Sequence, residues 1–193
     1  MTEDASDGTL VDRYRQGDAE ALAALVEKYR RPLFAYVLNM TEGREDVDEI
    51  FQEVWFRVIR RIGRYRQRSF YGWIVRIAHN LVIDRARRRR PSVPLDADAD
   101  PDGYAPAETL PAAAADPAAV SADADLGRRI ARAVRELPPE QREVFVLRTH
   151  GGLSFKEVAA VQRVSINTAL ARMQYALGKL RLMLQEDYEQ LDR

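Results

Sequence analysis

The sequence of 193 residues contains no cysteine and only two histidines, His79 and His150. The absence of cysteine excludes disulfide bonds, thiolate zinc sites and cysteine nucleophiles. Because the two histidines are isolated, we expect no histidine-based metal site and interpret both as structural. No apolar run approaches the roughly 20 residues that a membrane span needs, and the polar residues 1–7 are unlike a signal peptide. We therefore expect a cytoplasmic protein without a metal, a cofactor or a membrane span.

Charge is balanced overall but is sorted into blocks along the chain. Residues 57–90 contain twelve arginines and one acid, Asp84, whereas residues 91–125 contain eight acids and no lysine or arginine. Residues 42–53 carry six acids against one base, Arg44. Alternating blocks of this kind favour several distinct charged partners over one uniform charged surface.

Residues 9–90 predict an almost continuous series of helices. Asp18 is a candidate N-cap for the first long helix, and Pro32 inside that helix is expected to kink or divide it. A second helix is predicted from about residue 45, with an apolar face formed by Val47, Ile50, Phe51, Val54, Val58 and Ile59. Residues 63–68 indicate a loop, and Ser69 is expected to cap a third helix.

Residues 91–125 are rich in proline, alanine and aspartate and show no sustained amphipathic period. Such a segment cannot bury enough surface to offset the entropy of ordering it, so we interpret it as a flexible acidic linker. The sequence then divides into residues 1–90, the linker 91–125 and residues 126–193. We predict an all-α protein with two small helical domains joined by this linker.

The segment after the linker predicts a helix-turn-helix. Ser154 and Glu157 match a capping box at the start of a short helix, and Ser165 is a candidate cap for a longer last helix. Ala159 is small enough for the two helices to approach closely. One face of the last helix offers side chains that hydrogen-bond base edges or phosphates or touch a thymine methyl: Asn167, Thr168, Ala171, Arg172, Gln174 and Tyr175. A helical hairpin with a solvated polar face is the alternative interpretation.

The basic residues 57–90 include interleaved aromatic residues, among them Tyr65, Phe70 and Trp73. Guanidinium groups pair with phosphates and aromatic rings stack on exposed bases, so this composition suits single-stranded nucleic acid. In the alternative interpretation Phe70 and Trp73 belong to the core, and the arginines only solvate a helix.

The acidic residues 45–53 raise the question of catalysis. Catalytic carboxylates need a pocket or a metal ion, and these acids follow one helix face with no histidine nearby in sequence. We expect no catalytic residues. A solvated face or a docking surface for a basic partner explains the acids better.

These motifs together resemble the extracytoplasmic-function group of the sigma-70 family. Residues 45–55, Glu-Asp-Val-Asp-Glu-Ile-Phe-Gln-Glu-Val-Trp, look like sigma region 2.2. Residues 69–80, followed by Asp84 and Arg87, look like regions 2.3 and 2.4. Residues 137–145 and 152–160 resemble region 4. The resemblance covers both domains in the right order.

The resemblance implies a DNA-binding subunit of RNA polymerase with three sets of contact residues. Core polymerase, through its β′ clamp helices, is expected to bind Asp46, Glu49, Gln52, Glu53 and Trp55. The minus-ten promoter element, melted on the non-template strand, is expected to bind Tyr65, Ser69, Phe70, Trp73, Arg76, Asn80, Asp84, Arg87 and Arg88. The duplex minus-thirty-five element is expected to bind Ser165, Asn167, Thr168, Ala171, Arg172, Gln174 and Tyr175, on a domain that also packs on the β flap.

The resemblance leaves open the role of the linker, one further partner and one rival function. Family linkers enter the RNA path of the polymerase, whereas the composition of residues 91–125 also fits a solubilising tether. An anti-sigma factor is an expectation inherited from the family. The rival function is a free-standing helix-turn-helix regulator. The sequence departs from the family at Arg163, where glycine is usual, and at Leu170, where the family often has a phosphate-binding lysine.

Overall fold

The computed structural model describes residues 6–41, 44–66, 69–89 and 117–185. Among these residues the chain forms α helices and one short 3-10 helix. The elements are α1 (Asp7–Arg15), α2 (Ala19–Met40), α3 (Arg44–Arg61), η1 (Ile62–Arg64), α4 (Phe70–Arg89), α5 (Pro117–Glu136), α6 (Pro139–Thr149), α7 (Phe155–Gln162) and α8 (Ile166–Met183). The all-α class predicted from the sequence is confirmed.

Helices α1–α4 form an N-terminal helical unit around a core of Leu25, Tyr36, Val54, Ile62 and Ile74. Asp18 caps α2 by accepting a hydrogen bond from the Glu20 amide, as the sequence predicted. Ser69 accepts a hydrogen bond from the Gly72 amide at 3.0 Å, which also confirms its predicted capping role for α4.

Of the two effects expected of Pro32, division of the helix does not occur, because α2 continues as one helix of 22 residues. One local prediction for this unit was wrong. Ile59 was placed on the apolar face of α3, yet it is exposed, because the buried positions here are Val58 of α3 and Ile62 of η1.

The linker predicted over residues 91–125 lies outside the described residues as far as residue 116. From Pro117 the backbone is helical, so α5 begins nine residues before the point where the sequence pattern indicated a helix. Proline at the first position of a helix costs no hydrogen bond, which makes it a suitable start.

Helices α5–α8 form a C-terminal helical unit that contains the predicted helix-turn-helix. Both members of the capping box are present: the Ser154 hydroxyl accepts from the Glu157 amide, and the Glu157 carboxylate accepts from the Ser154 amide. Ser165 caps α8 by accepting from the Thr168 amide at 3.0 Å. Between the helices, Arg163 adopts the left-handed conformation with φ of 56°, in place of the usual glycine.

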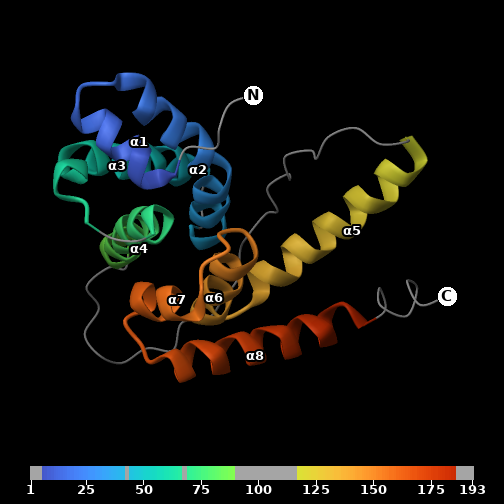
Figure 1. Ribbon diagram of the computed structural model, residues 1–193. Coiled ribbons are helices and arrows are strands. Elements are labelled where there is room, and N and C mark those ends of the chain that lie inside the picture. The colour runs from blue at the N-terminus through green and yellow to red at the C-terminus, as the bar shows by residue number, and fades with distance from the viewer. Residues whose placement is uncertain (1–5, 42–43, 67–68, 90–116, 186–193) are drawn as a thin grey trace.

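The two helical units pack directly against each other. Helix α6 contacts α2, and α7 contacts α4, so the helix-turn-helix lies beside the N-terminal unit (Figure 1). The far half of α5 and the far half of α8 extend away from this contact. The buried residues of both units belong to one continuous apolar cluster.

Candidate nucleic-acid interface

Helix α3 carries its acids in two different environments. Glu49 and Gln52 are exposed, and Glu53 is half-buried and pairs with Arg57 one turn later at 2.7 Å. Asp46 is buried and forms an ion pair with Arg85 of α4 at 2.7 Å. The same arginine reaches Glu49 at 2.5 Å, so Arg85 fastens α4 to α3.

The electrostatics of this contact follow from its geometry. The hydrogen bond from Arg85 and its positive charge lower the pKa of Glu49 below its ordinary value. The hydrogen bond to Glu49 raises the pKa of Arg85 above its ordinary value, against a smaller opposing effect of burial. Both groups stay charged at neutral pH. The exposed part of this network is screened by water and contributes little to stability.

A groove of about 850 Å³ runs between α3 and α4. Its lining residues are Glu49, Ile50, Gln52, Glu53, Phe56, Arg57, Leu81, Asp84, Arg85 and Arg88. Phe56 is exposed at its edge and was not selected from the sequence. Trp55, which was selected, is buried in the core at 7% exposure. Asp46 and Trp55 therefore hold α3 in place, while Glu49, Gln52 and Glu53 are the residues of that set that face outward.

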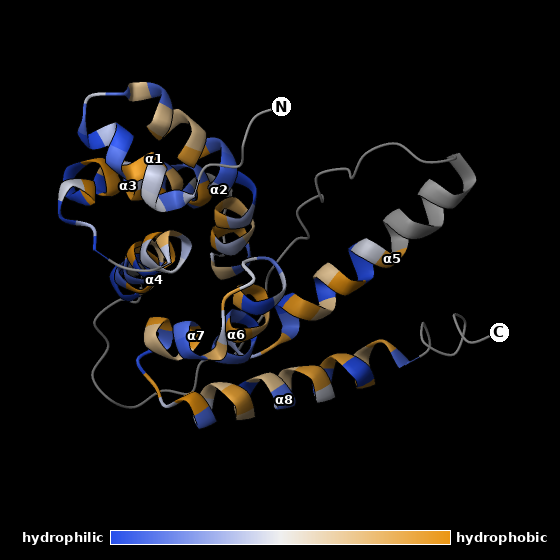
Figure 2. Cartoon of the chain, viewed as in Figure 1, coloured by the Kyte–Doolittle hydropathy of each residue, from blue (hydrophilic) through white to orange (hydrophobic). Residues whose placement is uncertain are grey.

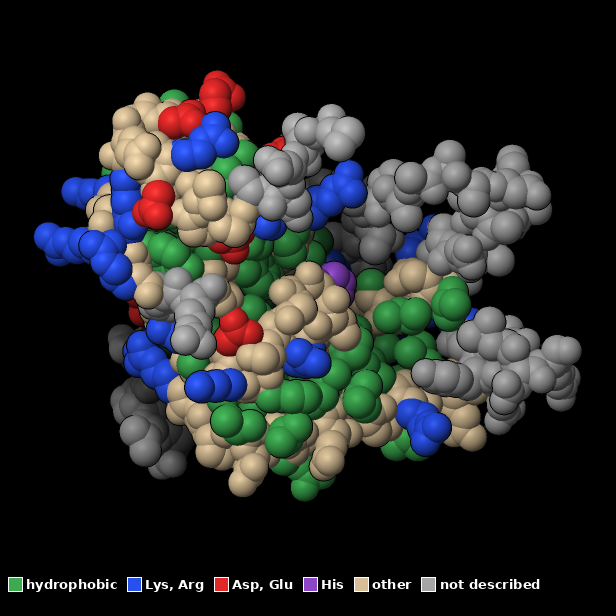
Figure 3. Space-filling view, viewed as in Figure 1, with side chains coloured by type: hydrophobic (Ala, Val, Ile, Leu, Met, Phe, Trp, Pro, Cys, Tyr) green, Lys and Arg blue, Asp and Glu red, His purple; other side chains and the backbone are tan. Residues whose placement is uncertain are grey.

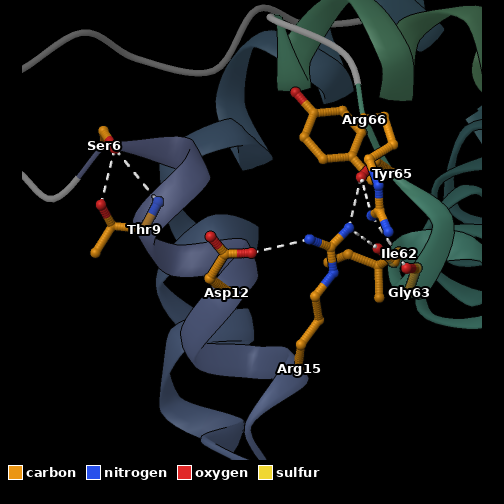
Figure 4. A network of polar contacts seen from close by, with 8 residues as sticks. All are labelled: Ser6, Thr9, Asp12, Arg15, Ile62, Gly63, Tyr65 and Arg66. Atoms are coloured by element: carbon orange, nitrogen blue, oxygen red, sulfur yellow. Dashed lines mark hydrogen bonds and ion pairs between the residues drawn. The ribbon is translucent and has the colours of Figure 1, made fainter.

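The backbone after α3 is held by Arg15 of α1 (Figure 4). The Arg15 Nη2 atom donates to the carbonyls of Ile62 at 3.0 Å and Tyr65 at 2.5 Å. Arg15 is itself oriented by Asp12 at 2.8 Å. Nothing in the local sequence pattern selects Arg15, because its partners lie about 50 residues further along the chain.

The aromatic residues around the start of α4 form a cluster. Tyr65, Phe70 and Trp73 contact one another with ring centroids 5.0 to 5.6 Å apart. Phe70 is fully buried, Tyr65 is buried and Trp73 is half-buried. Burial raises the pKa of Tyr65 to about 12. In this arrangement Phe70 and Tyr65 are core residues, and of the three only Trp73 presents part of its ring to the surface.

The polar residues predicted at the start of α4 and along it are more accessible to solvent than Tyr65 and Phe70. Asp84, Arg87 and Arg88 are exposed, and Ser69, Arg76 and Asn80 are half-buried. Figure 3 shows lysine and arginine side chains gathered on the side of the molecule formed by α3, the following loop and α4. This side can attract phosphate groups.

The helix-turn-helix presents the selected residues of α8 largely as predicted. Asn167, Thr168, Gln174 and Tyr175 are exposed, together with the cap residue Ser165. Ala171 and Arg172 are half-buried, and Arg172 donates to the side chain of Gln162 at 2.9 Å. The wedge between α7 and α8 is filled by Val158, Ala159 and Ala169, which are buried.

Helix α8 also exposes several large apolar side chains along its length. Figure 2 shows apolar residues recurring along its length. The exposed large apolar residues on this helix are Ile166, Leu170, Tyr175, Leu177, Leu182 and Met183. An apolar surface of this kind is typical of a protein-binding face.

Comparison with models of known protein families identifies the family of this chain. The sigma-70 region 2 family model matches residues 25–91, and the sigma-70 region 4 model matches residues 127–180. The two matches together span most of the chain. This chain is an extracytoplasmic-function sigma factor of the sigma-70 family. Sigma factors direct promoter recognition by RNA polymerase and are not enzymes.

Curated relatives support the same assignment. The sigma factor is 30% identical over 168 residues to the ECF RNA polymerase sigma factor SigE of Mycolicibacterium smegmatis, covering 86% of this chain and 63% of the relative. It is 27% identical to SigW of Bacillus subtilis, covering 91% of this chain and 95% of the relative. It is 28% identical to the sigma-E factor of Escherichia coli, covering 90% and 91%.

Solved structures share the fold. The sigma factor superposes on CnrH, solved in complex with the cytosolic domain of CnrY, with a TM-score of 0.66 and 24% identity, covering 95% of this chain and 99% of CnrH. It superposes on RpoE, solved with the anti-sigma factor NepR from Bartonella quintana, with a TM-score of 0.59 and 17% identity, covering 89% and 96%. Within the described residues, no helix combines the length and apolarity needed to cross a bilayer.

Proposed function

We propose that this sigma factor docks on core RNA polymerase through the outward face of α3. The observation that supports the proposal is the groove between α3 and α4, whose α3 side presents the carboxylates of Glu49 and Glu53 and the amide of Gln52. Asp46 and Arg85 hold the two walls of the groove together, so the rim is preorganised before the partner arrives. An acidic rim with exposed Phe56 suits a basic and partly apolar partner, as the β′ clamp helices are expected to be.

The minus-ten element is assigned to the basic side of α4. Arg87 and Arg88 are exposed where they can pair with phosphates, and Asn80 and Asp84 lie on the same helix with hydrogen-bonding groups for bases. Trp73 is the ring available for stacking, and Phe70 and Tyr65 support it from the core. The remaining residues of this set, Ser69 and Arg76, stay in the proposal as half-buried contacts.

The minus-thirty-five element is assigned to the exposed polar face of α8. Ser165, Asn167, Thr168, Gln174 and Tyr175 are accessible to a major groove. Ala171 and Arg172 are less exposed, and Arg172 would have to leave Gln162 to reach DNA. The apolar residues Leu177, Leu182 and Met183 further along α8 fit the expected contact with the β flap.

An anti-sigma factor and the division of the chain are further proposals. The relatives solved as complexes, CnrH and RpoE, are bound to CnrY and to the anti-sigma factor NepR. We therefore include an anti-sigma factor among the partners of this chain. The division into residues 1–90, 91–125 and 126–193 is also proposed, with the acidic segment acting either in the RNA path or as a tether.

The docking proposal is tested by equilibrium binding to purified bacterial core polymerase. The double variant Gln52→Ala/Glu53→Ala should bind at least about tenfold more weakly, which corresponds to roughly 1.4 kcal/mol. The matched control is Glu20→Ala/Glu27→Ala, which removes two side chains at exposed positions of α2. Equal affinities for the two double variants would place the docking surface elsewhere.

A further inference from the structure

Four arginines lie close together in the sequence where α3 ends and the chain turns toward α4. Arg60, Arg61, Arg64 and Arg66 are all exposed, and we call them the basic corner. Residues 57–83 contain no aspartate or glutamate. Figure 3 shows lysine and arginine side chains gathered at this edge of the molecule. None of the four belongs to the DNA-contact sets predicted from the sequence.

The backbone of the basic corner is fixed by contacts with the rest of the N-terminal unit. Ile62 and Tyr65 are buried, at 2% and 8% exposure, while the arginines between and beside them remain exposed. The Tyr65 amide donates to the Ile62 carbonyl at 3.1 Å, which closes the turn of η1. Both carbonyls accept from Arg15, and Arg66 also donates to the Tyr65 carbonyl at 2.9 Å (Figure 4). The corner therefore presents its charges from an ordered backbone.

The arginines of the basic corner keep their positive charge available. Among the residues that the structure describes, neither Arg61 nor Arg64 has an ion-pair partner. The Arg60 guanidinium lies over the Phe56 ring at 5.2 Å from its centroid, and a contact with an aromatic ring leaves the charge in place. The corner can therefore attract an anionic partner.

The acids of α1, the helix that packs on η1, do not neutralise this charge. Asp12 pairs with Arg15 at 2.8 Å, and Asp7 pairs with Lys28 at 3.0 Å. Both carboxylates are thus already matched by cations outside the basic corner. The partner of the corner must come from outside the described part of the chain.

The basic corner continues the surface assigned to minus-ten DNA. Arg64 and Arg66 flank Tyr65, whose ring contacts the Trp73 ring with centroids 5.0 Å apart. From Trp73 to Arg87, α4 extends about 21 Å at about 1.5 Å per residue. This length matches about six nucleotides at about 3.4 Å each. Nucleic acid that fills the surface of α4 and continues past Trp73 therefore meets the corner.

The Trp73 ring indicates in which direction the DNA runs. Only unpaired bases expose a face for stacking, so melted DNA belongs at the Trp73 end of α4 and duplex DNA toward Arg87 and Arg88. In a promoter the duplex minus-thirty-five element lies upstream, and the strands have to open from the minus-ten element toward the start site. The basic corner therefore lies on the downstream side of the minus-ten element.

We propose that the basic corner binds backbone phosphates of the non-template strand immediately downstream of the minus-ten element. The inference rests on the proposed minus-ten assignment and extends it to residues outside that set. Four arginines alone fit many polyanions, but their position beside a partly exposed stacking ring favours single-stranded DNA. Because phosphates carry no sequence information, this contact strengthens binding without changing base preference.

The experiment measures binding of the holoenzyme, formed with purified bacterial core polymerase, to two forked DNA probes. Each probe comes from a promoter obtained by library selection and is duplex upstream, with a single-stranded non-template overhang. In the short fork the overhang ends with the minus-ten element, and in the long fork it continues about five nucleotides further. For the unaltered protein the long fork should bind at least about tenfold more tightly.

Arg61→Gln/Arg64→Gln should reduce this gain to less than about threefold and leave the affinity for the short fork within about twofold. Arg30→Gln/Arg31→Gln is the matched control, because it removes two exposed arginines from α2, and it should keep the full gain. Arg61→Lys/Arg64→Lys retains the charges and should keep most of the gain. An equal gain for the unaltered protein and Arg61→Gln/Arg64→Gln, or no gain for either, would overturn the inference.

Salt dependence gives a second measurement with the same probes. The slope of log K against log salt should be steeper for the long fork by about 1.4, since each of two phosphates on a single strand contributes about 0.7. Arg61→Gln/Arg64→Gln should remove this difference. A difference in slope that persists in this variant would overturn the inference.

A third variant separates failure of this inference from failure of the minus-ten assignment. Arg87→Gln/Arg88→Gln should weaken binding of the short fork, which ends before the basic corner. An unchanged affinity for the short fork would overturn the minus-ten assignment, while the gain from the extension would still decide whether the corner binds DNA. If Arg61→Gln/Arg64→Gln weakens both forks equally, the corner does not act downstream and the inference fails.

Discussion

Arg163 adopts a strained backbone conformation in the turn of the helix-turn-helix. Its φ of 56° lies in the left-handed region, which costs a residue with a Cβ atom roughly 1–2 kcal/mol. The family usually places glycine at this turn, and Arg163 adopts the left-handed conformation in its place. The helix-turn-helix therefore forms because the capping box and the wedge residues outweigh the strain.

Arg163→Gly should raise the free energy of unfolding by about 1 kcal/mol, because glycine adopts a positive φ without steric cost. Arg163→Ala is the matched control, since it also removes the contact with Asn80 but keeps the Cβ atom. Chemical denaturation of both variants measures the difference. A glycine variant no more stable than the alanine variant would contradict a strained turn.

The environment of Glu143 determines whether its contribution to the free energy of unfolding is gained or lost as the pH falls. Burial raises the pKa of this carboxyl, but the hydrogen bonds from His79, Tyr36 and Gln162 outweigh burial and hold it below its ordinary value of 4.5. A lowered pKa contributes stability above 4.5 that is lost as the pH falls through the folded-state pKa. The stability difference between wild type and Glu143→Gln should shrink over that acidic window. Denaturation curves at stepwise lower pH test this, and a constant difference would contradict it.

Helix caps could be predicted from the sequence, whereas contacts between residues far apart in the chain could not. Asp18, Ser154 and Ser165 were identified as caps because each cap and its partner lie within three residues. His79 was interpreted only as structural, because its partner Glu143 lies 64 residues away. Burial of Phe70 and Trp55 was equally hidden, since an aromatic residue at helical spacing suits both a core and a base-stacking role.

At the element scale, the loop between α3 and α4 depends on α1. Arg15→Ala removes both hydrogen bonds to the carbonyls of Ile62 and Tyr65, so the loop should lose its fixed position. We expect promoter melting, measured by permanganate reactivity of unpaired thymines, to fall about tenfold, which corresponds to roughly 1.4 kcal/mol. Arg13→Ala is the control, because Arg13 on the same helix pairs with Asp18 and not with the loop. Equal effects of both substitutions would contradict this positioning role.

The recognition helix carries a second prediction at this scale. Leu170 is partly exposed on α8 where the family often has a phosphate-binding lysine. Leu170→Lys should strengthen promoter binding and steepen the dependence of log K on log salt by about 0.9, the effect of one additional phosphate contact. Ile130→Lys, at an exposed position of α5 outside the proposed contact sets, is the control and should leave the slope unchanged. The measurement is holoenzyme–promoter affinity at several salt concentrations, and an unchanged slope for Leu170→Lys would contradict the assigned orientation of α8.

Element boundaries followed from the sequence where turn residues mark them. The glycine pair at residues 151–152 and the proline pair at residues 138–139 correctly separated α5, α6 and α7. The start of α5 was placed too late, because the alanine-rich residues 117–125 show no amphipathic period. Pro32 does not end α2, because the rest of the helix packs against α3 and α4 and stays helical despite the missing donor.

At the scale of the whole molecule, the order of motifs was sufficient to predict two sigma domains, and the family matches confirm them. The packing of the two helical units against each other could not be predicted from the sequence, because it arises from pairs such as Arg142 with Asn39 that lie about 100 residues apart. The charge blocks nonetheless indicated separate partners. In the structure, Glu49 and Glu53 of the acidic block and Arg57, Arg85 and Arg88 of the basic block line the same α3–α4 groove.

Run-off transcription with purified bacterial core polymerase on a promoter library tests the central claim most directly. The account predicts specific start sites that depend on this protein and that disappear with Gln52→Ala/Glu53→Ala but persist with Glu20→Ala/Glu27→Ala. No stimulation by the protein, combined with tight and sequence-specific binding of duplex DNA by the protein alone, would contradict the account and favour a free-standing regulator.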